Sequence, residues 1–172
     1  MTERSRGRPR DADIDARVLA AAQHQLASEG YDAMSFVAVA EEAGTTRQAL
    51  YRRWPSKADL ATAAIAALAQ AGAVAPTDGP YADLVAELTA FRRGVSRPDG
   101  LSMVGTMLLA STDPDLVDLY RERIVAPRRA RLRAILERGR DAGLLAADAD
   151  IDVALGMFTG NWYACALAGD RP

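Results

Sequence analysis

The sequence has little of what disulfide frameworks, metal sites and many catalytic centres are built from. Its 172 residues include one cysteine, Cys165, and one histidine, His24, which is expected to lie partly buried in a helix. A single cysteine excludes an internal disulfide and is typical of a protein of the reducing cytoplasm. The sequence also has no phosphate-binding glycine loop and no nucleophile elbow. We therefore expect no metal, no cofactor and no enzymatic activity.

Long hydrophobic runs and a strong net charge are missing as well. The longest weakly polar run, residues 60–76, is interrupted by Thr62 and Gln70 and is rich in alanine, which favours a helix over a membrane span. The N-terminus, MTERSRGRPRDADID, has no apolar core and so is not a signal peptide. With a net charge of −2, any basic function must come from local clustering. We expect a soluble, cytoplasmic protein with no membrane partner.

The pattern of apolar residues predicts an all-α chain. Apolar residues recur at spacings of three and four, alanine is abundant, and β-branched alternation is scarce. The segment 72–80, GAVAPTDGP, holds two glycines and two prolines and is the clearest domain boundary. Helices are expected from near Asp13 to Ser28, over 36–42 and 47–54, from 57 through about four turns, over 81–95, 101–111 and 113–125, from about 127 to 142, and from 151 to about 168.

Capping residues support several of these boundaries. Asp13 is expected to cap the first helix, and Asp150 the last. Ser35 and Thr46 each precede a short helix, and Gly44 separates the two. Ser56-Lys57-Ala58-Asp59 resembles a capping box that opens the next helix.

The two short helices around Gly44 have the pattern of a helix-turn-helix. The second one lies in the stretch RQALYRRWPSK, residues 47–57, which mixes cations with Tyr51 and Trp54. The major groove of DNA admits one helix, and the N-terminal side chains of that helix read base edges. Arginine pairs with guanine and glutamine with adenine, so Arg47 and Gln48 are the expected base readers.

Other residues of this segment suit contacts with phosphate and sugar, which set the register on DNA. Further along the stretch, Lys57 stands in the first turn of the next helix, where free backbone N–H groups help to hold an anion. Trp54 and Leu50 are expected to face the small core. The full set of expected DNA-contacting residues near the helix-turn-helix is Ser35, Thr45, Thr46, Arg47, Gln48, Tyr51, Arg52, Arg53 and Lys57.

Taken as pattern alone, this stretch also fits a basic, solvated helix in an ordinary bundle. A resemblance favours the DNA-binding interpretation. The segment from Gly30 to Leu60, GYDAMSFVAVAEEAGTTRQALYRRWPSKADL, resembles the DNA-binding domain of TetR-family transcriptional regulators. It departs from the family pattern at Arg53, where the family often has histidine, and at Ala38, where a polar or acidic residue is common.

The resemblance implies a homodimeric repressor with an N-terminal three-helix DNA reader and a C-terminal helical bundle for ligand binding and dimerisation. The domains expected on this basis are a flexible basic arm (1–12), the helix-turn-helix domain (13–56), a connecting helix (57–75) and the ligand-binding and dimerisation domain (76–172). The DNA partner implied is a palindromic operator, because a two-fold dimer presents two reader helices about 35 Å apart.

The N-terminal tail carries a second candidate for DNA contact. Arg6-Gly7-Arg8-Pro9-Arg10 looks like the core of an AT-hook, an extended segment that places arginines in a narrow A·T minor groove. The alternative is a disordered, solubilising tail. Its position directly ahead of a major-groove reader favours the functional interpretation, with Arg6, Arg8 and Arg10 as the contacting residues.

Apolar residues of the C-terminal half are candidates for an effector pocket. Methionine adapts to irregular apolar ligands, and a small hydrophobic effector is the expected partner. A stripe of such residues at helical spacing is equally typical of a core. The expected pocket residues are Phe91, Met103, Met107, Tyr120, Phe158 and Trp162.

The last two helices are the candidate dimer surface. They are so apolar that something must cover them. Gly156 and Gly160 would let a partner helix approach closely. Packing within the chain is the alternative, and Asn161 and Tyr163 could face the pocket instead. The expected interface residues are Leu132, Ile135, Leu136, Leu155, Gly156 and Gly160.

Two functions therefore follow from the sequence. The favoured one is a DNA-binding repressor that a small effector releases from its operator by shifting the helix that begins at Lys57. The alternative is a helical protein-interaction dimer whose helix-turn-helix is vestigial and whose basic helix meets an acidic partner.

Overall fold

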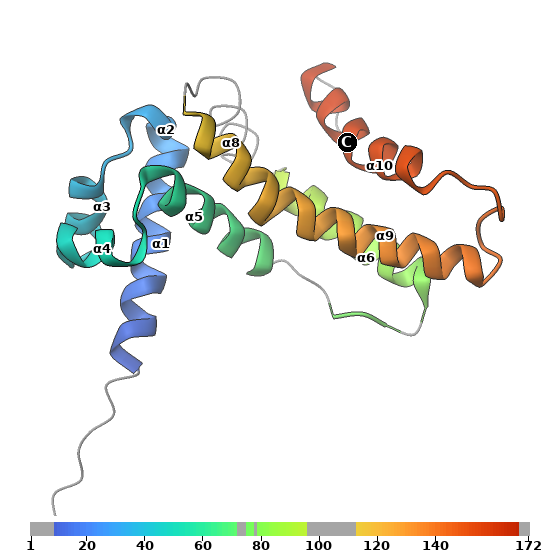
Figure 1. Cartoon of the computed structure of the whole chain (residues 1–172), viewed down its shortest axis with the longest axis horizontal. Coiled ribbons are helices and arrows are strands. Elements are labelled where there is room, and N and C mark those ends of the chain that lie inside the picture. Colours follow the sequence, from blue (N-terminus) through green and yellow to red (C-terminus); the bar gives the residue numbers. More distant parts are fainter. Residues whose placement is uncertain (1–8, 72–74, 78, 96–112, 169–172) are drawn as a thin grey trace, which may run out of the picture. The chain divides into compact units, whose positions relative to one another are not determined.

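A computed structural model describes residues 9–71, 75–77, 79–95 and 113–168, without the side chains of residues 9–12, 95, 162, 163, 166 and 167. Over these ranges the regular structure is helical and contains no strand (Figure 1). The expected helix at 101–111 lies outside the described residues. The elements are α1 (Pro9–Ser28), α2 (Gly30–Ala33), α3 (Phe36–Ala43), α4 (Arg47–Arg53), α5 (Lys57–Ala71), α6 (Pro80–Val95), α8 (Pro114–Tyr120), the π-helical turn η1 (Arg121–Val125), α9 (Ala126–Asp141) and α10 (Ile151–Ala168). The all-α prediction is confirmed.

The chain forms two compact units. The first unit comprises Met1–Ala67 with Pro98–Tyr120, and the second comprises Leu68–Arg97 with Arg121–Pro172. The helix expected at 113–125 is divided, and its first part, α8, groups with the N-terminal helices. The remainder forms η1, and Pro127 falls in the first turn of α9. Pro127 cannot donate an N–H to the carbonyl of Arg123, so the usual α-helical bond is missing at the position where the wider turn occurs.

Helix α1 begins earlier than expected. It starts at Pro9, so residues 9–12, expected to be part of the flexible arm, are helical. Proline suits a first helical position because its φ is already helical and no N–H is needed there. Asp13 is therefore not a cap but lies inside the helix, where its carboxylate is 3.9 Å from Arg17. His24 on the same helix is exposed rather than partly buried, with its Nδ1 3.0 Å from Glu42.

Apolar residues from α1, α3, α4 and α5 form the core of the first unit. Val18, Ala22 and Leu26 of α1 are buried. Polar contacts lock the elements together: the Gln23 side chain donates to the carbonyl of Ala64 at 2.8 Å. The other buried apolar residues of these four helices are Ala21, Phe36, Val39, Ala40, Ala43, Leu50, Ala58, Leu60, Ala61, Ala64 and Ile65.

Tyr31 joins the N-terminal helices to the start of α8. Its ring is buried, and its hydroxyl donates to Asp113 Oδ2 at 2.5 Å, across 82 residues of sequence. Burial, and then the bond to Asp113, raise the pKa of the Tyr31 hydroxyl well above its ordinary value. The hydroxyl therefore stays protonated and keeps donating over the whole neutral range.

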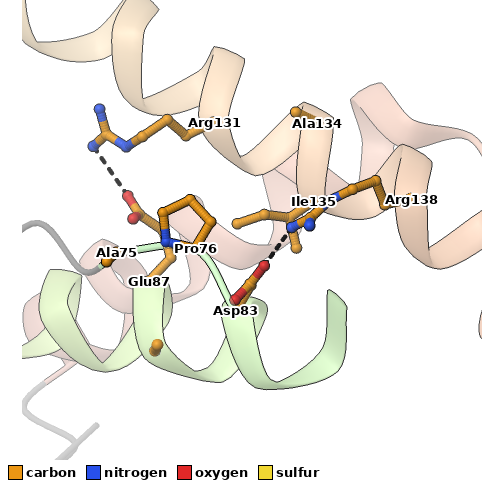
Figure 2. Close-up of a pocket in the computed structure, with 9 residues that line it drawn as sticks. Ala75, Pro76, Asp83, Glu87, Arg131, Ala134, Ile135 and Arg138 are labelled. Carbon is orange, nitrogen blue, oxygen red and sulfur yellow. Dashed lines mark hydrogen bonds and ion pairs between the residues drawn. The ribbon is translucent and has the colours of Figure 1, made fainter. Parts of the chain in front are cut away.

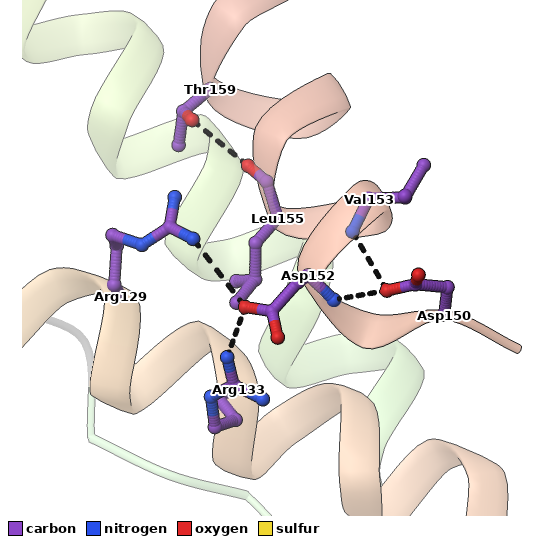
Figure 3. A network of polar contacts seen from close by, with 7 residues as sticks. All are labelled: Arg129, Arg133, Asp150, Asp152, Val153, Leu155 and Thr159. Atoms are coloured by element: carbon purple, nitrogen blue, oxygen red, sulfur yellow. Dashed lines mark hydrogen bonds and ion pairs between the residues drawn. The ribbon is translucent and has the colours of Figure 1, made fainter.

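In the second unit, α6 and α10 pack on α9. Leu132, Leu136, Ile151 and Leu155 form its buried centre, and Leu84, Leu88, Leu145, Ala154 and Phe158 pack around them. Asp150 caps α10 as predicted: Oδ1 accepts from the N–H groups of Asp152 at 2.9 Å and Val153 at 3.1 Å (Figure 3). The Asp152 carboxylate, in turn, pairs with Arg129 at 3.6 Å and with Arg133, both on α9.

Replacement of Tyr31 by Phe is expected to lower the free energy of unfolding by about 1–3 kcal/mol, because a hydrogen bond to a carboxylate is lost while the ring stays. The matched control is Tyr81→Phe on α6, where the side chain is 72% exposed and a near-neutral effect is expected. Urea unfolding at pH 7 measures both. Equal stabilities of the two variants would contradict the role assigned to the Tyr31 hydroxyl.

Candidate nucleic-acid interface and cavity

The turn between α3 and α4 is fixed at both ends by caps. Ser35 Oγ accepts from the N–H of Ala38 at 3.2 Å, and Thr46 Oγ1 accepts from the N–H of Ala49 at 3.1 Å. Gly44 ends α3 with φ of 66°, a left-handed conformation that favours glycine. These three predicted boundaries are confirmed.

Helix α4 packs against the rest of its unit with one side and exposes the other side to solvent. Leu50 is buried and Trp54, one turn later, is half-buried, so both anchor the helix as expected. Arg47, Gln48 and Arg52 are exposed, and together with Tyr51 they occupy the opposite side of a helix that is only seven residues long. Thr46 is exposed and Thr45 half-buried at its N-terminal end.

Tyr51 is involved in more contacts than a surface tyrosine usually is. Its ring is stacked on the ring of Phe36, the first residue of α3, with centroids 4.3 Å apart and planes 3° from parallel. Arg47 Nη2 donates to the Tyr51 hydroxyl at 3.4 Å, and the Arg47 Cζ lies 5.2 Å from the ring centroid. Tyr51 nevertheless remains 42% exposed.

The remaining cations near α4 have protein partners. Arg53 Nη1 lies 2.7 Å from Asp15 Oδ1 of α1. Lys57 Nζ donates to the carbonyl of Asp32 at 3.0 Å and lies 4.5 Å from the centroid of the Tyr31 ring. The capping box at the start of α5 is present: the N–H of Asp59 donates to Ser56 Oγ at 3.0 Å. The sequence did not reveal Asp15 as the partner of Arg53, because the ion pair joins α1 to α4 and the hydrophobic pattern does not specify how these two helices pack.

The arginine-rich tail is mostly outside the described residues. Arg6 and Arg8 precede them, and Arg10 belongs to α1 but its side chain is not described. The minor-groove interpretation of this tail stays a prediction.

A cavity lies between α6 and α9 of the second unit (Figure 2). Its volume is ≈ 250 Å³. Apolar side chains form its floor, with Pro76 and Ile135 pointing toward one another, and two ion pairs stand beside them. One joins Arg131 to Glu87 at 3.1 Å, and the other joins Arg138 to Asp83. The lining residues are Ala75, Pro76, Asp83, Ala86, Glu87, Arg131, Ala134, Ile135 and Arg138.

The residues predicted to form an effector pocket do not line this cavity. Phe91 is buried beside Arg128, whose guanidinium carbon lies 4.5 Å from the ring centroid. Tyr120 is buried and belongs to the first unit, and Phe158 packs against the core of the second. Met103, Met107 and the side chain of Trp162 lie outside the described residues. The lining of this cavity differs from that set, because it consists of alanines, one proline, one isoleucine and paired charges, and the expected effector residues stay a prediction.

The residues predicted to form the dimer interface differ in their exposure. Leu132, Leu136 and Leu155 are buried against one another within their own unit, so packing inside the chain accounts for them, and they are not on a free surface. Ile135 lines the cavity. Gly156 and Gly160 are exposed on α10, as are Val153 and Met157, at 56% and 69%. A Cβ added at either glycine would meet nothing within 4 Å.

Asp83 lines the cavity and ties α6 to the segment that precedes it. The Thr77 hydroxyl and the Thr77 N–H each donate to Asp83 Oδ1 at 2.6 Å, and Arg138 donates to Oδ2. The Thr77 hydroxyl first, and then Arg138, lower the pKa of the Asp83 carboxyl to about 2.

Two further observations concern the described parts of the chain. No group of histidine, cysteine, aspartate and glutamate there is arranged to hold a metal ion. No helix in those ranges is both long and apolar enough to cross a membrane.

Comparisons with known proteins place both halves of the chain. Residues 18–72 match the model of the bacterial regulatory proteins of the tetR family, and residues 74–172 match that of the tetracyclin repressor-like C-terminal domain. An uncharacterized HTH-type transcriptional regulator, YdeS of Bacillus subtilis, is 29% identical over 96% of this chain and 85% of its own length. The DNA-binding transcriptional repressor TetR of Mycobacteroides abscessus is 31% identical over 84% of this chain and 79% of its own length.

Solved structures show the same architecture. The TetR family transcription regulator SCO0332 superposes with a TM-score of 0.71 at 32% identity, covering 93% of this chain and 89% of its own. FadR from Bacillus subtilis, solved in complex with stearoyl-CoA, superposes with a TM-score of 0.70 at 18% identity, covering 84% of this chain and 81% of its own. At that identity, the second likeness shows the fold alone.

A pH titration tests the Asp83 arrangement. Because the pKa of Asp83 is depressed in the folded protein, its stabilising contribution is present above the unfolded pKa near 4 and is lost as the pH falls from about 4 to about 2. Asp83→Asn is expected to be less stable than the parent at pH 7 and to lose less stability between pH 4 and pH 2. Chemical unfolding across this range measures both. Parallel pH profiles would contradict the arrangement; the control is Asp148→Asn in the exposed loop after α9.

Proposed function

The chain belongs to the TetR family of bacterial transcriptional regulators, and from that premise we propose that it is a repressor that binds a palindromic operator as a homodimer and leaves it when a small effector binds. The observation that carries the proposal is the exposed side of α4, where Arg47, Gln48, Tyr51 and Arg52 stand together on a helix with a capped N-terminus and a buried anchor at Leu50.

On this proposal, Arg47 and Gln48 read bases in the major groove, and Arg52 contacts phosphate. Ser35 and Thr46 hold the two helices by capping them, with Thr45 beside them at the turn. Lys57 reaches phosphate from the first turn of α5, where the Tyr31 ring and the Asp32 carbonyl already position its ammonium group. Arg6 and Arg8 add a minor-groove contact, and Arg10, which belongs to the first turn of α1, adds phosphate attraction.

Dimerisation is proposed through the open face of α10. Gly156, Gly160, Val153 and Met157 make this face small and apolar, and a partner helix can approach the two glycines closely. A two-fold dimer places two α4 helices on successive major grooves of one side of DNA, about 35 Å apart.

The effector site proposed is the cavity between α6 and α9. Its apolar floor and paired charges fit a small, mainly apolar molecule with one polar group. Ala75 and Pro76, which line it, follow α5 by a few residues, and α5 begins at Lys57. An effector that contacts these residues differently in the two states of the protein shifts α5 and so changes operator affinity.

Two neighbouring arginines test the DNA-binding surface. Arg52→Ala is expected to weaken DNA binding evenly across sequences and to flatten the slope of log affinity against log salt by about one unit. Arg53→Ala is expected to change that slope by roughly half as much or less, because Asp15 already neutralises its charge. Fluorescence anisotropy with labelled duplex at several salt concentrations measures both. Unchanged affinity in Arg52→Ala would favour the protein-interaction alternative.

A filled cavity tests the effector site. Ile135→Trp places an indole in a space of ≈ 250 Å³ and is expected to abolish any thermal stabilisation that a screen of small apolar compounds detects for the parent protein. The matched control is Val85→Trp on the exposed side of α6, which should keep the response. If Ile135→Trp responds to every compound as the parent does, the effector binds elsewhere.

A further inference from the structure

The contact between Phe36 and Tyr51 lies at the junction of the two helices of the helix-turn-helix. Phe36 is 7% exposed and belongs to the core, whereas Tyr51 is 42% exposed and belongs to the DNA-facing side of α4. Their rings are nearly parallel, with centroids 4.3 Å apart. A buried ring on α3 therefore supports an exposed ring on α4 and limits its choice of rotamer.

Tyr51 passes this restraint on to Arg47. The two residues are four apart on α4 and so are neighbours on its surface. The Arg47 guanidinium contacts Tyr51 in two ways: Nη2 donates to the hydroxyl at 3.4 Å, and Cζ lies 5.2 Å from the ring centroid. An aromatic face and a hydroxyl acceptor together restrain a guanidinium that would otherwise sample many rotamers.

From these contacts we propose that Phe36 is a specificity-determining residue, which acts through Tyr51 to hold Arg47 ready to read a base. Phe36 is a positioning residue, because it is buried and acts through its contact with Tyr51. The proposal rests on the proposed DNA-binding function and deepens it. The base recognised is guanine, whose O6 and N7 accept two hydrogen bonds from one guanidinium.

The benefit of such a stack is a smaller loss of freedom on binding. A long side chain that is already restrained gives up fewer rotamers when it meets its base, so more of the hydrogen-bond energy is expressed as affinity for the correct base. Gln48, the other proposed base reader, lies beside Arg47 but is not part of this stack. It serves as an internal control.

The experiment compares base preferences of purified full-length variants. The parent protein first selects its operator from a random DNA pool, and Arg47→Ala and Gln48→Ala identify the base pair that each side chain reads. Phe36→Leu, which keeps a buried apolar group and removes the flat ring, is then titrated against operators carrying each base at those two pairs. Discrimination at the Arg47 pair is expected to fall roughly three- to tenfold. Discrimination at the Gln48 pair and the salt slope are expected to stay unchanged.

Two further variants separate positioning from folding. Val39→Ala, in the core of α3, is expected to lower the thermal midpoint without changing either base preference. Tyr51→Leu, at a half-exposed position, removes the stack without opening the core and should reproduce the loss at the Arg47 pair even if Phe36→Leu does not fold. Tyr51→Phe keeps the ring and should retain part of the discrimination.

The outcomes are distinguishable. A parent that selects no sequence refutes the proposed DNA-binding function itself. The second outcome is that the parent selects an operator, but Phe36→Leu and Tyr51→Leu discriminate at the Arg47 pair as well as the parent does. That result overturns the role of Phe36 and leaves the proposed DNA-binding function intact. Equal loss at both base pairs overturns it too, because it shows a general disturbance of α4. Loss confined to the Arg47 pair supports the proposal.

Discussion

Helix α4 has only seven residues, and a helix of that length is unstable in water by itself. Everything proposed for this protein at DNA depends on how that helix is held. Thr46 satisfies an N–H at its start, Leu50 is buried beneath it, and Gly44 sets the direction in which the chain enters it. With these restraints in place, the remaining surface of α4 is free to carry charge and aromatic rings without any cost to the core.

The charged side chains around the two proposed sites fall into two groups. Buried carboxylates are paired with arginines, whereas an arginine proposed to contact DNA phosphate is exposed to solvent. Asp83 and Glu87 are buried, and each pairs with an arginine of α9. Arg53, which packs toward α1, pairs with Asp15. Arg52 is adjacent to Arg53 in sequence, but its side chain stays exposed. This difference between neighbours separates a residue that holds the N-terminal helices together from a residue proposed to contact DNA.

Sequence reasoning succeeded where the signal is local. Caps at Ser35, Thr46 and Asp150 and the left-handed Gly44 depend on hydrogen bonds within a few residues, and the structure confirms them. It failed where the answer depends on which helices meet. Leu132, Leu136 and Leu155 were expected at a dimer interface but are buried within their own unit, and the cavity between α6 and α9 is formed by small residues and ion pairs that an apolar pattern does not mark. The early start of α1 at Pro9 was missed because a charged tail with glycine and proline reads as irregular.

Dimeric recognition of DNA through α4 is tested most directly by selection of bound sequences from a random DNA pool by the purified protein, repeated at two salt concentrations. We expect one enriched palindrome that survives the higher salt, with half-sites about one helical turn apart, because the two α4 helices of the proposed dimer would read successive major grooves. Flanking A·T-rich enrichment would add a role for Arg6, Arg8 and Arg10. Enrichment of nothing, with binding that disappears as salt rises, would leave only phosphate attraction and contradict the account.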